Sequence, residues 1–272
     1  MMRSLWTAAS GMIAQQTNVD TISNNLANVN TTGYKAQSAE FKSLLYQNLQ
    51  TKTTTANGEN KPIPAEVGLG VRNSSITSHF SQGAFLASDS DTAYDINGDG
   101  FFAVRGVDGE TYYTRNGNFT YAVGVNGMML TTTDGLPVLD STGQEIVFDM
   151  SGYDMSKVRV STDGQFGYLD DDGNYQDLGM QIGVFQFNNP SGLEKMSGSH
   201  LAETVAAGQA INEALTDTVQ KSTIKSGYLE GSNVQVADEM VNLIIAQRAY
   251  EMNSKAIQAS EEMLSQANQL RR

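Results

Sequence analysis

The chain has 272 residues, a formal net charge of −13 at pH 7, two histidines and no cysteine. This length is enough for one large domain or two smaller ones with a real core. The lack of cysteine excludes disulfides, thiolate metal sites and cysteine nucleophiles. No apolar run approaches the roughly 20 residues of a membrane-spanning helix, so we expect no membrane insertion.

The charge is unevenly distributed along the chain. Residues 1–50 carry three basic and two acidic side chains, residues 51–230 carry ten and 23, and residues 231–272 carry four and five. The nearly neutral ends are typical of surfaces that pack against something, whereas the acidic middle is typical of a solvated body. No basic patch is available to neutralise phosphates, so we expect no binding to nucleic acid.

A helix is predicted at the beginning of the chain. A mostly apolar stripe has one set of residues spaced by seven and a second set three positions later. The first set is Leu5, Met12, Val19 and Leu26, and the second is Ala8, Gln15, Ile22 and Val29. Gly11 weakens the stripe. Because polar residues and Gly11 interrupt the apolar segment and the stripe continues far beyond it, we expect no cleaved signal peptide.

The stripe ends in the run NNLANVNTTGYK, Asn24 to Lys35. Asn and Thr side chains compete for backbone hydrogen bonds, and Gly33 permits a left-handed backbone angle. We interpret this run as a corner where the chain leaves the helix. Residues 47–66 follow soon after; they are polar, Thr-rich and contain two prolines, which favours a linker or long loop.

The middle of the chain has the pattern of an antiparallel β domain. Asx-Gly dipeptides, which favour tight hairpins, alternate with β-rich segments such as FFAV and MQIGVFQF. The dipeptides are Asp108-Gly109, Asn116-Gly117, Asn126-Gly127, Asp134-Gly135, Asp163-Gly164 and Asp172-Gly173. Residues 202–215 also fit a short helix.

A second long helix is predicted at the other end, beginning with Ser232 or Asn233 as its N-cap. From residue 232 onward there is no glycine or proline. Asp238 and Glu239 in the first turn suit the helix dipole. The residues spaced by seven are Val236, Leu243, Tyr250, Ile257 and Leu264, and the face is widened by Met240, Ile244, Met263 and Ala267.

The predicted fold class is α+β, with the terminal helices pairing as a coiled-coil-like domain around a central antiparallel β domain. A seam two heptad positions wide is not stable alone in water, so each helix needs the other and then further chains. The expected divisions are residues 1–45 as the N-terminal helical half, 46–69 as an extended linker or loop, 70–225 as the β domain and 226–272 as the C-terminal helical half.

Motifs that suggest chemistry are weak. Asp95 to Gly100 matches half of a calcium loop, but the twelfth position is Gly106 instead of Glu. Gly98 to Ala103 matches a dinucleotide fingerprint but precedes a strand. The acidic run at 170–174 is interpreted as a hairpin tip. His79 and His200 are expected in loops or at the surface, so we predict no catalytic, cofactor-binding or metal-binding residues.

Both ends of the chain resemble the bacterial flagellar rod and hook proteins. The N-terminal similarity runs over SLWTAASGMIAQQTNVDTISNNLANVNTTGYK, and the C-terminal one over GYLEGSNVQVADEMVNLIIAQRAYEMNSKAI. The middle is more loosely similar at NGDGFFAV and YYTRNGNF. The family-motif residues of the N-terminal segment are Asn25, Ala27, Asn28, Thr32, Gly33, Tyr34 and Lys35. Trp6, the EFKSLLYQNL segment and the length are most similar to the distal rod type, in which a segment near 47–66 is associated with a stiff, straight tube.

The resemblance implies a structural subunit without enzyme activity. Such proteins pass through the flagellar type III export apparatus and polymerise helically into a hollow shaft that transmits torque from motor to hook. Their paired helices form the inner wall and the β body the outer layer. The implied partners are other copies of the chain, proximal rod proteins, the hook protein and envelope ring proteins, and the implied location is the rod that crosses the cell envelope. We expect the seam residues Leu5, Met12, Val19, Ile22, Leu26, Val236, Leu243, Tyr250, Ile257 and Leu264 to pack subunits together.

Two alternatives remain open from the sequence. A hook or proximal rod subunit would share the terminal motifs. A calcium- or sugar-binding β protein with coiled-coil ends would explain the acidic turns and the helices without any polymer.

Overall fold

A computed structural model describes residues 2–50, 65–124, 127–148, 157–169, 175–216 and 219–270. The chain forms two compact units. The helical unit comprises the residues up to Ala27, Gln37–Ser78 and the residues from Gln235 onward. The β unit comprises Asn28–Ala36 and His79–Val234. The chain therefore passes from one unit to the other four times.

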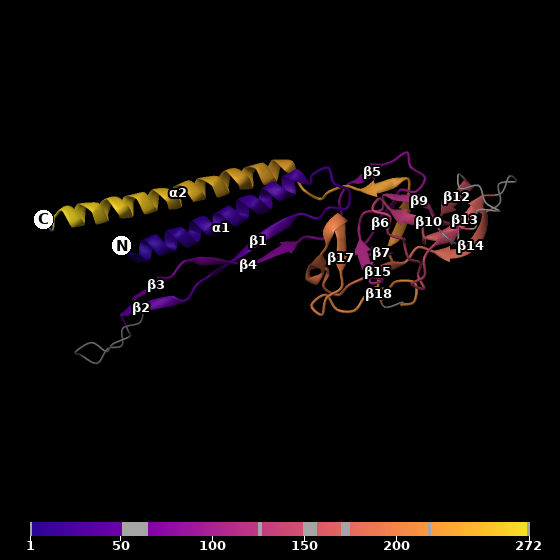
Figure 1. Ribbon diagram of the computed structural model, residues 1–272, viewed down its shortest axis with the longest axis horizontal. Helices are drawn as coiled ribbons and strands as arrows, with labels where there is room; N and C mark the ends of the chain where they lie inside the picture. The colour runs from indigo at the N-terminus through magenta and orange to yellow at the C-terminus, as the bar shows by residue number, and fades with distance from the viewer. Residues whose placement is uncertain are drawn as a thin grey trace. The chain divides into compact units, whose positions relative to one another are not determined.

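Two antiparallel helices dominate the helical unit. Helix α1 spans Met2–Ala27 and helix α2 spans Val236–Gln269, and they lie side by side in Figure 1. The predicted pairing of the two chain ends is confirmed. Helix α2 begins later than expected, because its N-cap is Gln235, which has an extended backbone and makes no side-chain cap. Ser232 and Asn233 belong to the β unit instead.

The helical unit also contains two antiparallel strand pairs. Strand β1 (Gln37–Ser43) pairs with β4 (Val71–Ser78), and α1 packs against both. Strand β2 (Tyr46–Gln50) pairs with β3 (Ala65–Gly68). The segment 46–69 was expected as a linker or loop, but its described ends are paired strands, because main-chain hydrogen bonds form between polar residues as readily as between apolar ones. Residues 51–64, the centre of the segment expected to stiffen a tube, lie outside the described residues.

The β unit is antiparallel throughout its described strand pairs, which confirms the predicted class. Its largest sheet has the order β16-β17-β8-β7-β15-β18, and two three-stranded sheets have the orders β11-β10-β9 and β12-β13-β14. The six strands of the largest sheet are, in chain order, β7 (Phe101–Arg105), β8 (Thr111–Thr114), β15 (Val184–Gln186), β16 (Glu194–Lys195), β17 (His200–Ala202) and β18 (Ile211–Asn212).

The smaller sheets complete the β unit. Their strands are β9 (Phe119–Gly124), β10 (Gly127–Thr132), β11 (Val147–Phe148), β12 (Val158–Val160), β13 (Gln165–Leu169) and β14 (Tyr175–Gln181). Two further pairs join β5 (Phe85–Ala87) to β20 (Tyr228–Glu230), and β6 (Tyr94–Asn97) to β19 (Thr223–Ser226). Two short 3₁₀ turns lie at Pro190–Gly192 and Ser197–Ser199. Residues 202–215, all described, contain β18 and no helix, contrary to that expectation.

Strand β7 lies between two apolar cores, because successive side chains of a strand point to opposite faces. Phe102 belongs to a core that includes Phe119, at a ring distance of 5.1 Å. Its neighbour Phe101 belongs to the other core and lies 5.8 Å from the ring of Phe187. The FFAV segment is therefore apolar at every position because both of its faces are buried.

The Asx-Gly dipeptides divide into two groups. Gly109 and Gly164 have φ angles of +81° and +82° and lie in the turns between β7 and β8 and between β12 and β13, as predicted. Gly117 differs, because β8 and β9 on its two sides belong to separate sheets. A Cβ atom at Gly117 would lie 1.7 Å from the carbonyl oxygen of Tyr94. This glycine permits a close approach of two backbones and not a hairpin. Asp172-Gly173 lies outside the described residues.

We predict that Gly117→Ala lowers the free energy of unfolding of the β unit by about 3 kcal/mol, because a backbone carbonyl cannot move aside as a flexible side chain can. Gly109→Ala is the control, since nothing lies within 4 Å of its added Cβ. That change should cost about 1 kcal/mol, through the positive φ angle alone. Urea unfolding followed by the near-ultraviolet circular dichroism of the buried tyrosines measures both. Equal losses would contradict the close-approach explanation.

Candidate assembly site

Small side chains are prominent among the buried residues of the two helices. Ala8 and Ala14 of α1 are 7% and 3% exposed, and Ala246 and Ser260 of α2 are 1% and 4% exposed. Small residues allow helix backbones to approach closely and to gain dispersion energy over many atoms. Ile22, at 5% exposed, is the one large apolar residue of the predicted seam that is buried to a similar degree.

The register of the two helices is constant over their length. The Ser4 and Ser260 hydroxyls lie 3.3 Å apart, and the Asn25 Nδ2 donates to Glu239 Oε1 at 3.2 Å. Between these contacts, a Cβ on Gly11 would lie 2.8 Å from the Asn253 Nδ2. Each step forward along α1 therefore corresponds to an equal step backward along α2, as expected of antiparallel helices with one register. Gly11 does not weaken the pair, as the sequence suggested, because it provides the space that Asn253 occupies.

Asn25 fixes the end of α1. Its side chain is completely buried; Nδ2 donates to the carbonyl of Gln37 at 2.7 Å, and Oδ1 accepts from the N–H of Gln37 at 2.9 Å. This pair of bonds imitates a strand partner and holds the beginning of β1 beside the helix. Burial raises the pKa of Glu239, and its bond with Asn25 counteracts this rise. Asn25, placed in the family motif from sequence, therefore has a definite structural role.

The predicted seam residues have different environments in the single chain. Ile22 is buried, and the other α1 members, Leu5, Met12, Val19 and Leu26, are half-buried. On α2, Leu243 and Ile257 are half-buried on the side that carries Ala246. Val236, Tyr250 and Leu264 are 41%, 43% and 38% exposed. The single chain thus leaves part of the predicted seam uncovered.

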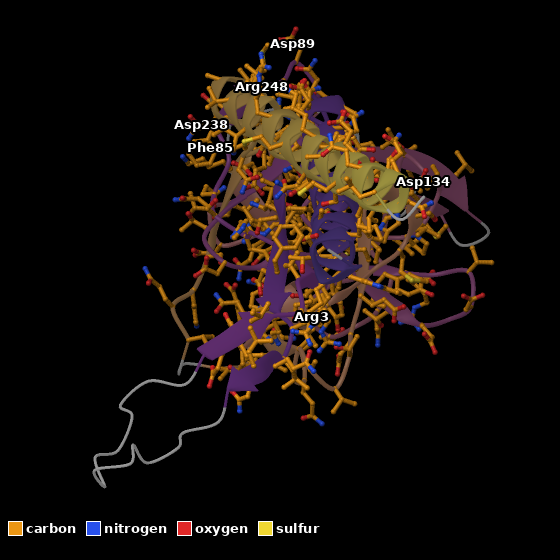
Figure 2. The ribbon with its side chains drawn as sticks, turned by 90° about the vertical axis from the view of Figure 1, so that its left-hand side faces the viewer. Arg3, Phe85, Asp89, Asp134, Asp238 and Arg248 are labelled. Atoms are coloured by element: carbon orange, nitrogen blue, oxygen red, sulfur yellow. The ribbon has the colours of Figure 1, made fainter. Side chains whose placement is uncertain are left out.

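A second apolar stripe lies on α2, and the heptad analysis named only one of its residues, Met263, as part of the widened face. It consists of four residues, here called the outer stripe: Val241, Ile245, Met252 and Met263, which are 55%, 61%, 65% and 49% exposed. On α1, Trp6 and Ile13 are 75% and 68% exposed. Spacings of four, seven and eleven are helical, so a search for a second apolar period could have found the outer stripe. Arg248, labelled in Figure 2, pairs with Glu251 on the same helix at 3.0 Å.

The second half of the family motif belongs to the β unit. Gly33 has a φ of +71°, and its N–H donates to the carbonyl of Glu230 at 2.8 Å. A Cβ there would lie 2.7 Å from the main-chain nitrogen of Asn116. The Thr32 hydroxyl donates to Asn116 Oδ1 at 2.9 Å. The predicted corner is therefore a docked segment, and glycine is needed at position 33 for both its angle and its proximity to another backbone.

The remaining motif residues surround this docked turn. Ala27 is exposed, and it ends α1. The carbonyl of Asn28 accepts from the N–H of Thr31 at 3.1 Å, and the N–H of Tyr34 donates to the carbonyl of Thr31 at 3.3 Å. Asn28 and Tyr34 are half-buried. These local bonds shape residues 28–34 into a turn.

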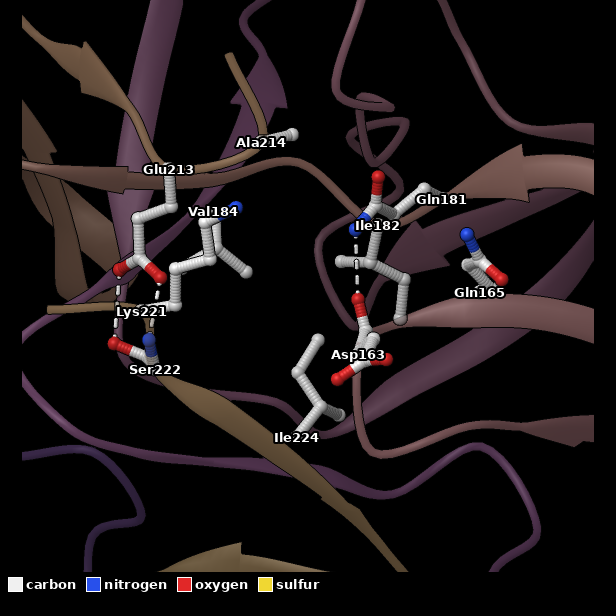
Figure 3. A pocket seen from close by; sticks show the side chains of 10 residues that line it. All are labelled: Asp163, Gln165, Gln181, Ile182, Val184, Glu213, Ala214, Lys221, Ser222 and Ile224. Atoms are coloured by element: carbon white, nitrogen blue, oxygen red, sulfur yellow. Dashed lines mark hydrogen bonds between the residues drawn. The ribbon is translucent and has the colours of Figure 1, made fainter. Parts of the chain in front are cut away.

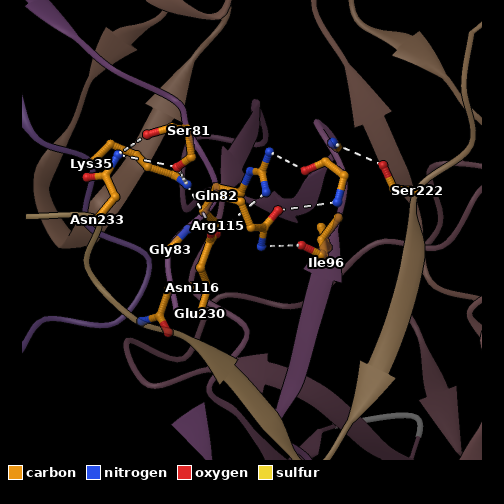
Figure 4. Close-up of polar contacts among 12 residues, drawn as sticks. Lys35, Ser81, Gln82, Gly83, Ile96, Arg115, Asn116, Ser222, Glu230 and Asn233 are labelled. Atoms are coloured by element: carbon orange, nitrogen blue, oxygen red, sulfur yellow. Dashed lines mark hydrogen bonds and ion pairs between the residues drawn. The ribbon is translucent and has the colours of Figure 1, made fainter. Parts of the chain in front are cut away.

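Four buried charged residues form the centre of the docked segment, here called the Lys35 cluster: Lys35, Asp95, Arg115 and Glu230. Lys35 Nζ lies 2.7 Å from Glu230 Oε1 and donates to the carbonyl of Ser81 at 2.8 Å (Figure 4). The same carboxylate oxygen accepts from the N–H of Gly83 at 2.9 Å. Arg115 Nη1 lies 3.5 Å from Glu230 Oε2. None of the four residues is more than 6% exposed.

The environment of the cluster compensates its charges. Arg115 Nη2 donates to the carbonyl of Gly98 at 2.8 Å, and the guanidinium lies 4.9 Å from the centre of the Phe101 ring. Burial lowers the pKa of Lys35, and Glu230 opposes this change. Burial and the charge of Glu230 raise the pKa of Asp95 to about 6. Glu230 is the acid at ion-pair distance from both cations, so removing Glu230 would leave their buried charges poorly compensated, which costs several kcal/mol.

Other candidate sites are occupied by structural contacts. Asp95 and Asn97 lie in β6 and not in a loop, and in the described part of the chain no three His, Cys, Asp or Glu side chains are grouped to hold a metal ion. His200 was expected in a loop or at the surface. It lies in β17, is 7% exposed and has its Nε2 3.3 Å from Asp134 Oδ2, because β17 pairs with the buried strand β8.

A cavity of about 350 Å³ lies beside β15 and β19 (Figure 3). Its buried carboxylate, Glu213, accepts from the N–H and the hydroxyl of Ser222 at 2.6 and 2.8 Å, and from Gln186 Nε2 at 2.8 Å. These bonds join the end of β18 to the segment before β19.

None of the described helices is both long and apolar enough to span a membrane.

Comparison with known proteins agrees with this arrangement. Residues 5–35 match the flagella basal body rod protein family, residues 95–168 the flagellar hook protein FlgE/F/G D1 domain, and residues 225–270 the C-terminal family of flagellar basal body rod FlgEFG proteins. The chain is 41% identical over 274 residues to the flagellar basal-body rod protein FlgG of Borreliella burgdorferi, covering 100% of both chains. The chain belongs to the flagellar basal-body rod family.

Two further relatives extend the same similarity. The flagellar basal-body rod protein FlgG of Agrobacterium fabrum is 37% identical over 271 residues, with 97% of each chain covered, and that of Bacillus subtilis is 35% identical over 275 residues, with 100% of each chain covered. In this rod-family chain, the N-terminal match ends at Lys35, and the C-terminal match contains Glu230. The two terminal sequences that identify the family therefore meet in one buried ion pair.

We predict that Asp95→Asn stabilises the rod-family chain at pH 7.5 by on the order of 1–3 kcal/mol, because the folded protein no longer has to bury that carboxylate in its charged form. The pKa of Asp95 is about 6 in the folded chain and its ordinary value is 3.8. The folded state therefore binds the extra proton between these values, and the contribution of Asp95 to stability falls as pH rises through this window. The advantage of the variant should shrink at pH 4.5, as measured by urea unfolding. A variant less stable than the parent at pH 7.5 would contradict the argument.

Proposed function

We propose that this chain is the structural subunit of the distal part of the flagellar rod, and that it polymerises helically into a hollow shaft that transmits torque from motor to hook. The observation that carries the proposal is the exposed apolar surface of the paired helices. Residues such as Ile245 and Met252 of the outer stripe, and Trp6 of α1, are more than half exposed in the single chain.

The energy available from this surface favours assembly. A large apolar side chain contributes roughly 1.5–3 kcal/mol when it is fully buried. The exposed members of the seam and the outer stripe therefore supply a driving force once other copies cover them. A contact between different faces of identical chains generates a helical polymer when its rotation does not close into a ring.

The charge distribution supports the same arrangement of surfaces. The terminal segments that form the helices carry +1 and −1, so packing many copies of them together brings little like-charge repulsion. The acidic residues 51–230 suit a layer that remains in contact with solvent. We propose the paired helices as the inner wall of the shaft and the β unit as its outer layer, without enzyme activity.

The proposed partners follow from the same role. They are other copies of the chain, proximal rod proteins, the hook protein, envelope ring proteins and the flagellar type III export apparatus, through which the chain would pass without cleavage of a signal peptide. The names of the relatives, which are basal-body rod proteins, favour a rod subunit over a hook subunit.

We predict that Ile245→Asp prevents polymerisation of the purified chain while the β unit of its monomer stays folded. Ile245 is 61% exposed, so the new charge is solvated in the monomer and would be buried in the shaft, where it is costly. Sedimentation measures the polymer, and circular dichroism measures the fold. Leu243→Asp should also prevent assembly, but Leu243 is half-buried and its loss also affects the helix pair.

Gln247→Asp is the matched control, because it introduces the same charge at an exposed polar position two residues away. It should leave assembly nearly unchanged. If Ile245→Asp polymerised as well as Gln247→Asp does, the apolar surface of α2 would not be an assembly surface. Loss of motility in cells with Ile245→Asp, and not with Gln247→Asp, would support the same role in the flagellum.

We also predict that the isolated subunit has a folded β unit and frayed helices that become ordered on polymerisation. Hydrogen exchange of the monomer should protect strands such as β7 and β8 strongly and residues 5–29 and 236–264 weakly. The same helical amides should become protected in the polymer. Strong protection of both helices in a true monomer would argue against ordering on assembly.

A further inference from the structure

The β unit is closed by segments from both ends of the chain. Residues 28–36 enter it from the N-terminal side, and residues 223–234 enter it from the C-terminal side. Strands β5 and β6 have β20 and β19 as their partners, in two-stranded sheets. Two early strands of the β unit therefore obtain their main-chain hydrogen bonds from residues more than a hundred positions later in the chain.

The buried charges require the same late segment. Lys35 is 6% exposed and Arg115 is 4% exposed, and Glu230 lies at ion-pair distance from both (Figure 4). Without Glu230, Asp95 would be the one remaining acid of the Lys35 cluster. Burial of two cations with insufficient compensation is strongly unfavourable. Without residue 230, the compact β unit would therefore be destabilised by buried charges in its interior, in addition to the main-chain hydrogen bonds lost at its edge.

Backbone contacts add to this dependence. Asn233 Oδ1 accepts from the N–H of Ala36 at 2.7 Å, and its Nδ2 donates to the carbonyl of His79 at 2.9 Å. The N–H of Gly231 donates to the carbonyl of Ala84 at 2.8 Å. Asn233 thus joins three segments of the chain: the one that ends at Ala36, the one that begins at His79 before β5, and its own.

We propose that residues 223–234 act as a folding lock: the β unit reaches its folded state only when this segment is available to join it. Glu230 supplies the carboxylate for Lys35 and Arg115, and Asn233 joins the three passing segments. Residues 223–234 are the C-terminal end of the β unit. In any process that releases the chain N-terminus first, they emerge last, so folding of the unit has to wait for them. If the chain leaves the export apparatus of the proposed function with its N-terminus first, residues 79–222 remain unfolded until residue 234 has been released.

Refolding of the purified full-length chain tests the lock without any polymer, so its outcome is independent of the proposed assembly. Denatured protein is diluted into refolding buffer and pulse-labelled by hydrogen exchange at increasing times. We expect amides of β7 and β8 to become protected with the same time course as those of β19, β20 and residues 33–36. Protection of β7 and β8 in an earlier phase, while residues 223–234 still exchange freely, would overturn the proposal.

Equilibrium exchange of Glu230→Gln is the second measurement. We expect the exchange of β7 and β8 amides to accelerate at least about tenfold throughout the β unit, because loss of the lock opens the whole unit and not one edge. Glu145→Gln is the matched control, since Glu145 is exposed in the same unit, and it should leave these rates unchanged. If Glu230→Gln does not fold, Asn233→Ala, which removes no charge, is measured in its place with the same expectation. Acceleration confined to residues 223–234 would overturn the proposal in either variant.

Discussion

The contact between Lys35 and Glu230 is the interaction on which the β unit depends. A lysine ammonium and a carboxylate 2.7 Å apart are almost completely buried, and Arg115 shares the same carboxylate. Desolvation makes such a cluster a poor source of net stability, but it makes any arrangement that separates the partners very unfavourable. The cluster therefore selects one register between residues 28–36 and 228–234, which apolar packing alone would specify less strictly.

The helical unit shows the opposite chemistry. Its buried residues include small ones such as Ala8, Ala246 and Ser260, whereas large apolar residues such as Ile245 are exposed. Small residues bring two helices close together without using up the side chains that bury most area. The large apolar residues that stay exposed in a single chain are then available for contacts with neighbouring copies. A subunit built in this way is competent to assemble because it is incompletely buried on its own.

Much of this fold could be predicted from the sequence, because heptad spacing and Asx-Gly turns are local signals. They gave both helices, the antiparallel β class and turns such as that at Gly109. The predictions failed where two distant segments meet. Gly11 was interpreted by its low helix propensity, whereas Asn253 determines its role, and Asn116-Gly117 was interpreted as a hairpin, whereas the carbonyl of Tyr94 explains its glycine. The pair of Lys35 and Glu230, 195 residues apart, leaves no local pattern, although both lie in recognisable terminal motifs.

The two kinds of contact divide the requirements of a polymer subunit between them. Apolar surfaces associate readily but tolerate shifts in register, whereas buried polar contacts are costly to form wrongly and therefore specify geometry. In this chain the polar contacts of Asn25, Lys35 and Asn233 lie at or beside the points where the chain changes units. The apolar surfaces lie along the helices. The buried polar contacts thus fix geometry within the chain, and in the proposed shaft the exposed apolar residues would supply the cohesion between copies. Because the two sets do not overlap, a change in one can leave the other intact.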